Sequence, residues 1–202
     1  MQDKTNRENQ IDPEMVIERL NGRDAPDSSL ADPTAMSLTE LADHIEETHH
    51  AYLRGAMPHL GSLFEKVVRV HGNEHPWLVN AQDIFRGMSR ELQAHMMKEE
   101  QILFPMIRRI EAGDLTAALH GGGLENPIRV MMIEHDNAGD ALKKLRELSG
   151  DYQVPPDACN SFRELVVGLL AFERDMHQHV HKENNVLFPR SLRAGSPRGV
   201  SP

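Results

Sequence analysis

The sequence predicts an all-α protein: an up-down-up-down four-helix bundle made of two pseudo-symmetric helical hairpins, with a polar N-terminal extension. The string His-x-x-Lys-Glu-x-x-x-Leu-Phe-Pro occupies residues 95–105 and recurs 84 residues later at 179–189. A lone histidine precedes each copy, His50 by 45 residues and His135 by 44. Only 4% of residues are aromatic, whereas 11 are Met, which suits helices packed through Leu, Ile and Met. A duplicated hairpin buries its apolar faces by stacking on its copy, and this gives a four-helix bundle.

The first hairpin is expected to contain helices over residues 37–70 and 77–111. Ser37 followed by Glu40 forms a capping box at the first start, and Pro58 predicts a kink within that helix. Apolar and polar residues spaced three and four apart predict an inward face on the second helix, made of Ile84, Met88, Leu92, His95, Glu99, Ile102 and Met106.

The second hairpin is expected to contain helices over residues 126–148 and 157–192. Asn126 as cap and Pro127 at the first helical position predict the start of the former. Its inward face is expected to carry Ile128, Met132, His135, Leu142 and Leu145. The inward face of the last helix is expected to carry Leu165, Leu169, Phe172, Met176, His179, Glu183 and Val186.

Length and composition predict one bundle domain over residues 37–194. Residues 1–36 are polar and are interpreted as a partly disordered extension, and residues 195–202 as a flexible tail. A net charge of −9 argues against nucleic acid, and no 18-residue apolar run is present to cross a membrane. The polar N-terminus and the single cysteine, Cys159, predict a cytoplasmic protein.

The repeated motif contains candidate metal ligands. Residues four apart on a helix are neighbours about 5–6 Å apart, so His95 with Glu99, and His179 with Glu183, share a face. One such pair alone is more simply a surface ion pair. Two matching copies on core faces, joined by His50 and His135, predict four imidazoles and two carboxylates in one layer. The alternative is a hydrogen-bonded network of these side chains without metal, but it is disfavoured because buried carboxylates need a cation.

This ligand set predicts two metal ions about 3.5–4 Å apart, bridged by Glu99 and Glu183, each with two imidazoles. Nitrogen and oxygen ligands of this kind allow iron, manganese or zinc. Residue spacing alone does not choose among them.

Three strings resemble the hemerythrin-like (HHE cation-binding) family, and specifically its repair-of-iron-centres branch. They are the two motif copies and Ile-Glu-His-Asp-Asn-Ala-Gly at 133–139, within a resemblance that spans residues 37–193. The family's ligands fall on His50, His95, Glu99, His135, His179 and Glu183. The resemblance implies two non-haem iron ions, oxo- or hydroxo-bridged. The family's usual N-terminal domain, with its adjacent cysteine pair, has no counterpart in residues 1–36.

The resemblance also implies a function in nitrosative and oxidative stress. The expected partners are nitric oxide or dioxygen and iron–sulfur proteins, whose damaged clusters would be repaired, with the chain itself as an iron donor. An alternative is a di-iron enzyme that reduces nitric oxide or peroxide, and no catalytic residue is assigned for it. An oxygen-binding hemerythrin is disfavoured because no fifth His lies in phase with the ligands.

Three acidic residues are candidates for outer roles. Glu91 and Asp175 lie one turn before His95 and His179, where each is expected to accept the second imidazole N–H. Glu134 precedes His135 and is interpreted as lining an access channel or lying at the surface. The remaining motif-flanking and loop histidines are expected to be solvated, namely His49, His71, His75, His177 and His181.

Overall fold

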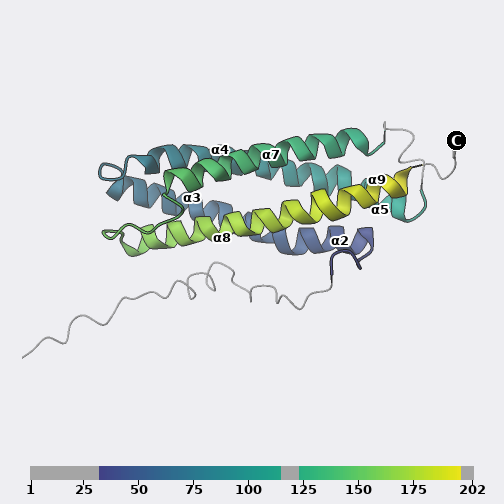
Figure 1. Cartoon of the computed structure of the whole chain (residues 1–202), viewed down its shortest axis with the longest axis horizontal. Helices are drawn as coiled ribbons and strands as arrows, with labels where there is room; N and C mark the ends of the chain where they lie inside the picture. The colour runs from purple at the N-terminus through teal and green to yellow at the C-terminus, as the bar shows by residue number, and fades with distance from the viewer. Residues whose placement is uncertain (1–31, 115–122, 197–202) are drawn as a thin grey trace, which may run out of the picture.

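A computed structural model describes residues 32–114 and 123–196. Most of the predicted N-terminal extension and the end of the predicted C-terminal tail lie outside these described residues. The described part is a bundle of long helices without a strand, as the sequence predicts (Figure 1).

The first hairpin has two arms, each a helix interrupted by one short π-helical turn. The first arm comprises α2 (Leu38–Ile45), η1 (Glu46–His50) and α3 (Ala51–His71). The second arm comprises α4 (Trp77–Lys98), η2 (Glu99–Leu103) and α5 (Phe104–Glu111). The predicted capping box is confirmed, because Ser37 Oγ accepts from the Glu40 amide and the Glu40 carboxylate accepts from the Ser37 amide.

The second hairpin pairs one uninterrupted helix with one that contains a π-helical turn. These elements are α7 (Glu125–Leu148), α8 (Asn160–Lys182), η3 (Glu183–Leu187) and α9 (Phe188–Gly195). The loops that join α3 to α4 and α7 to α8 lie at one end of the bundle, and α2, α5 and α9 gather at the other (Figure 1). Asn126 is not the cap of α7, because the helix already begins at Glu125 after Leu124. The last helix begins three residues later than predicted, at Asn160.

Proline explains two of the three π-helical turns. Pro105 and Pro189 are the second residues of α5 and α9, which directly follow η2 and η3. A proline ring clashes with the carbonyl four residues earlier and has no N–H to offer it. The chain widens here: the Phe104 amide donates to the Glu99 carbonyl and the Phe188 amide to the Glu183 carbonyl, five residues back in each case.

The wider turn η2 shifts the inward face by one residue, so the prediction that Ile102 faces the core is wrong. Ile102 is 54% exposed, whereas Leu103 and Phe104 are buried, because the extra residue rotates the helix after Glu99. A second correction falls on α7, where Met131 faces the core and Met132 is 44% exposed. The other predicted core positions are buried or half-buried.

A polar layer divides the apolar core into two clusters. The larger cluster packs α3, α4, α7 and α8, with residues such as Leu60, Phe85 and Phe172. The smaller packs α2, α5, the first turns of α7, and η3, with Leu41, Ile107 and others. Between them lie the histidines and glutamates of the repeated motif. Within the described residues, no helix has the length and apolar character needed to cross a bilayer.

Candidate metal centre

The six predicted ligand side chains converge in the polar layer between the two apolar clusters. Each is at most 4% exposed. They come from all four arms of the bundle: His50 ends η1, His95 lies in α4, Glu99 begins η2, His135 lies in α7, His179 lies in α8 and Glu183 begins η3. The turns η1, η2 and η3 therefore each begin or end at one of these residues, as π-helical turns at functional sites often do.

The six side chains form two overlapping groups of four that share both carboxylates. One position lies between His50 and His179, and the other between His95 and His135; in each, one candidate atom per residue lies within 4.8 Å of the others. The Nε2 atoms are 3.3 Å apart in the His50–His179 position. They are 3.1 Å apart in the His95–His135 position. Two nitrogens about 2.1 Å from one ion at a right angle would be about 3.0 Å apart.

The carboxylates lie between the two positions. Glu99 Oε2 is 3.3 Å from His50 Nε2 and also 3.3 Å from His95 Nε2. Glu183 uses separate oxygens, with Oε1 3.0 Å from His179 Nε2 and Oε2 3.0 Å from His135 Nε2. Each carboxylate can therefore reach both positions, as a bridging ligand must.

The electrostatics of the layer call for positive charge. Burial, and then the charge of Glu183, raises the pKa of Glu99 well above its ordinary value. Burial would also raise the pKa of Glu183, but the imidazoles of His179 and His135 hold it well below its ordinary value. Burial lowers the pKa of His95 to about 4, so that imidazole stays neutral at physiological pH. Two buried carboxylates beside a neutral imidazole are stabilised by a cation.

Hydrogen bonds on the outer side of the layer fix three of the imidazoles. We call a side chain that accepts from Nδ1 of a candidate ligand an outer partner. The three outer partners are Glu100 for His50 at 2.7 Å, Glu134 for His95 at 2.9 Å and Asn184 Oδ1 for His135 at 2.9 Å. With Nδ1–H donating outward, each Nε2 presents a lone pair inward to the carboxylates.

The inward-facing lone pairs fit a metal ion. Neither Glu99 oxygen, nor Glu183 Oε2, accepts a hydrogen bond from the described residues. Nitrogen and oxygen acceptors about 3 Å apart with no proton between them repel, and a buried acceptor left unsatisfied is costly. A cation between them would satisfy both kinds of atom, so the side chains present fit a metal centre.

Of the three predicted outer residues Glu91, Glu134 and Asp175, only Glu134 is the outer partner of a candidate ligand in the structure. The carboxylate of Glu134 accepts from His95 and also pairs with Lys98, because α7 lies beside the outward edge of the His95 ring. Glu91 is exposed and makes no hydrogen bond to His95, so its predicted partner role is wrong. Asp175 accepts from His49 Nδ1 at 2.8 Å instead of from His179, which is also contrary to the prediction.

The prediction that His49 is solvated is wrong. Its ring is 2% exposed and stacks on His179, with ring centroids 5.5 Å apart and an interplanar angle of 10°. Lys182 Nζ donates to His49 Nε2 and to His44 Nε2, each at 2.8 Å. His49 lies near the end of π-helical η1, where the helix is wider, and this accounts for the inward direction of a side chain adjacent to the ligand His50.

The other four histidines expected to be solvated differ among themselves. His177 and His181 are exposed, as predicted. His75 is half-buried, with Nε2 2.9 Å from Asp157. His71 is buried at the end of α3, where its Nε2 lies 3.2 Å from Cys159 Sγ, so its predicted solvation is also wrong.

Phenylalanine rings of the repeated motif pack against two of the imidazoles. Phe104 stacks on His50 with centroids 5.8 Å apart, and Phe188 stacks on His135 with centroids 6.0 Å apart. Both rings are fully or almost fully buried. The rings restrict the imidazoles from the apolar side, while the outer partners restrict them by hydrogen bonds.

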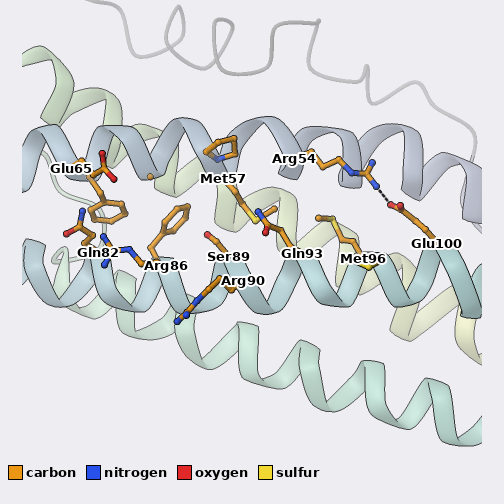
Figure 2. A pocket seen from close by; sticks show the side chains of 15 residues that line it. Arg54, Met57, Glu65, Gln82, Arg86, Ser89, Arg90, Gln93, Met96 and Glu100 are labelled. Carbon is orange, nitrogen blue, oxygen red and sulfur yellow. Dashed lines mark hydrogen bonds and ion pairs between the residues drawn. The ribbon is translucent and has the colours of Figure 1, made fainter.

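Two cavities approach the layer from outside. A cavity of about 190 Å³ is lined by His95, Glu91, Lys98 and Glu134, so it reaches a candidate ligand directly. A larger cavity of about 500 Å³ lies between α3 and α4 and reaches only Glu100, the outer partner of His50. Figure 2 shows Glu100 meeting Arg54 at the end of this larger cavity. The smaller cavity is therefore the more direct approach for a small molecule.

The sequence did not single out Glu100, Asn184 or His49. A usable signal was present for the first two, since Glu100 and Asn184 follow Glu99 and Glu183 directly and are 84 residues apart. His49 carries no such signal, because its counterpart across the repeat is Glu134.

Comparison with known proteins agrees with this geometry. The family model described as "Hemerythrin HHE cation binding domain" matches residues 40–191. "Iron-sulfur cluster repair protein YtfE" of Dickeya chrysanthemi is 39% identical over 183 residues, 91% of this chain and 79% of that protein. The same-named protein of Musicola paradisiaca is 38% identical over 184 residues, again 91% and 79%. "Probable iron-sulfur cluster repair protein" of Haemophilus influenzae is 39% identical over 161 residues, 80% of this chain and 68% of that protein. The chain belongs to the hemerythrin HHE cation-binding domain family, in the branch that contains these relatives.

Proposed function

We propose that the polar layer holds a dinuclear non-haem iron centre within a domain spanning residues 37–194. The observation that carries this proposal is the set of inward Nε2 atoms facing two buried carboxylates that each reach both positions. The proposed ligands are His50, His95, Glu99, His135, His179 and Glu183, with both glutamates bridging the two irons, which an oxo or hydroxo group would also bridge.

We further propose that the chain acts in the cytoplasm in the nitrosative and oxidative stress response, and that it supports the repair of damaged iron–sulfur clusters. The names of the relatives in Dickeya, Musicola and Haemophilus support this role. Iron–sulfur proteins would then be the clients, and iron held by the chain would be material supplied to them.

The residues of the chain have distinct tasks in this function. The apolar clusters on both sides keep the layer dry, which strengthens the interaction of the carboxylates with a cation. The outer partners orient the imidazoles and direct each Nε2 toward the layer. Iron with two imidazoles and bridging oxygens would retain open coordination positions for a small ligand such as nitric oxide. The cavity beside His95 gives such a molecule a route inward.

Oxygen transport is less well supported than repair. A carrier with an additional imidazole ligand would need a fifth inward histidine, and His49 is buried at the right level. Both of its ring nitrogens are engaged elsewhere, however, with Asp175 and with Lys182. His49 therefore presents no free nitrogen to the layer.

The test uses the full chain, loaded with ferrous iron without oxygen, and two alanine variants. His135→Ala removes a proposed ligand, and His177→Ala removes a 66% exposed histidine as the matched control. The wild type and His177→Ala are expected to hold two irons, bind nitric oxide and restore activity to a nitric-oxide-damaged [4Fe–4S] enzyme. His135→Ala is expected to lose bound iron and the recovery.

Two results would contradict the proposal. If His135→Ala left the iron content unchanged, the proposed metal centre would be refuted. If the wild type bound two irons but did not restore the damaged enzyme, the proposed repair function would be refuted and the proposed metal centre would stand. Catalytic consumption of nitric oxide or peroxide with an added electron donor would favour the enzymatic alternative instead.

A further inference from the structure

The fourth imidazole of the layer differs from the other three. His179 is fully buried, yet its Nδ1 has no hydrogen-bond partner among the described residues. The side chain next to it on the outer side is His49, which stacks on it with its ring nearly parallel. A stacked imidazole does not accept the in-plane N–H of its neighbour. His179 therefore lacks the outer partner that fixes each of the other three.

The internal repeat shows which residue is missing. His50 corresponds to His135, so His49 corresponds to Glu134. Glu134 accepts from Nδ1 of His95, the motif histidine of the first copy. The equivalent residue facing the second motif histidine is an imidazole whose Nδ1 donates to Asp175 and whose Nε2 accepts from Lys182. It has no atom left to accept from His179.

The charged groups on the outer side are also arranged differently at the two positions. Glu134 brings a carboxylate to the His95–His135 position and uses separate oxygens for His95 and Lys98. The His50–His179 position has Lys182 behind His49 instead. Its one carboxylate partner, Glu100, accepts from His50 and Arg54 through the same oxygen (Figure 2). Asp175 accepts from His49 and balances Lys182 there, as Glu134 balances Lys98, so the two positions differ in the hydrogen bonding of their imidazoles and not in net local charge.

Outer partners matter for affinity because they orient the ring and make the inner nitrogen a stronger donor. Loss of one such partner weakens metal binding by about 10–100-fold. The His95–His135 position has two oriented imidazoles, one through a carboxylate and one through an amide. The His50–His179 position has only one.

We propose that the two iron positions are inequivalent, and that the ion between His50 and His179 is held more weakly and is the one given up to an acceptor. His49 is the residue that sets this difference. The inference rests on the two-iron centre proposed above and adds to it which ion serves as the supplied iron.

The first experiment measures iron release from the full chain loaded with two ferrous ions without oxygen. An excess of a chromophoric ferrous chelator is added, and absorbance is followed in time. The wild type is expected to release one ion per chain in a fast phase and one in a slow phase. His49→Glu supplies the carboxylate that Glu134 supplies in the other half, so it is expected to slow the fast phase by about 10–100-fold and to leave the slow phase unchanged.

Glu134→Gln is the matched variant in the other half. It keeps the shape of a partly exposed side chain, so it should fold even if His49→Glu does not. It is expected to accelerate the slow phase and leave the fast phase unchanged. A crystal structure of protein stopped after the fast phase is expected to show iron between His95 and His135 alone, by anomalous scattering.

The outcomes separate the two proposals. Fewer than two bound irons in the wild type would overturn the dinuclear centre, and with it this inference. Two irons that leave in one phase, or a remaining ion found between His50 and His179, would overturn the inference and leave the centre intact. An accelerated fast phase in Glu134→Gln, with the slow phase unchanged, would also overturn it.

Discussion

Replacing Phe104 by leucine is expected to weaken metal binding in addition to the fold. The Phe104 ring is fully buried and stacks on His50 at 5.8 Å between centroids, with an interplanar angle of 15°. Leucine keeps the site apolar but removes the flat surface that limits rotation of the imidazole. Loss of the ring contact and the unfilled space together should cost the metal-free protein about 1–3 kcal/mol.

Phe172→Leu is the matched control. Phe172 is equally buried, but its ring meets Phe85 edge-on at 5.5 Å and, within the described residues, stacks on none of the proposed imidazole ligands. Both variants should therefore lose similar stability without metal. Only Phe104→Leu should also bind metal more weakly, by about tenfold, which lowers the stabilisation gained from saturating metal by about 1.4 kcal/mol.

The assay is urea unfolding of both variants and of the wild type, with chelator and with saturating ferrous iron in the absence of oxygen. The quantity compared is the metal increment, the free energy of unfolding with iron minus that without. Equal metal increments in Phe104→Leu, Phe172→Leu and the wild type would refute the view that this ring orients a ligand. A smaller increment in Phe172→Leu would show a general effect of core loosening.

Three further changes have expected outcomes. Glu99→Gln should abolish binding of two ions, yet it should stabilise the metal-free protein at neutral pH. Burial and the charge of Glu183 raise the pKa of Glu99, so the wild type loses stability as pH rises above about 4.5, and glutamine removes that loss. Urea unfolding at pH 5 and 8 checks this, and a variant less stable at pH 8 would contradict it. Glu100→Gln should weaken iron binding about 10–100-fold by loosening His50, as measured by chelator competition; unchanged affinity would count against the outer-partner role. Glu111 accepts from the first amides of α2 with a lowered pKa, because these hydrogen bonds outweigh its burial. The destabilisation by Glu111→Ala should therefore be complete above about pH 4.5 and shrink as pH falls below it, and a pH-independent loss would contradict this.

The bundle could be predicted because the repeat and the apolar spacing are properties of the chain alone. Helix boundaries were accurate where a local signal decides them, as at Ser37. The predicted start of α7 at Asn126 was wrong, because α7 begins at Glu125 and has no side-chain cap. The exposure of Ile102 could not follow from a regular helical period, because that period assumes no π-helical turn.

The six candidate ligands could be identified because a repeated His-x-x-x-Glu spacing places each pair on one face without knowledge of the neighbouring helices. Outer partners are different, because they come from an adjacent helix. Glu134 reaches His95 across the α4–α7 interface, and Glu100 reaches His50 from η2 to η1. Which side chains meet across an interface depends on the axial register of two helices, and a single helical period contains no information on that register.

The repeated string contains more than two ligands, because each of its positions has a structural task. Histidine and glutamate face the layer, and leucine and phenylalanine pack beside it. Proline forces the wider turn that begins at the glutamate. Lysine reaches the outer side, where Lys98 meets Glu134 but Lys182 meets His49. The two copies are thus identical in the residues that form the layer and differ in what surrounds it. A duplicated hairpin can in this way hold two similar ions with different strength.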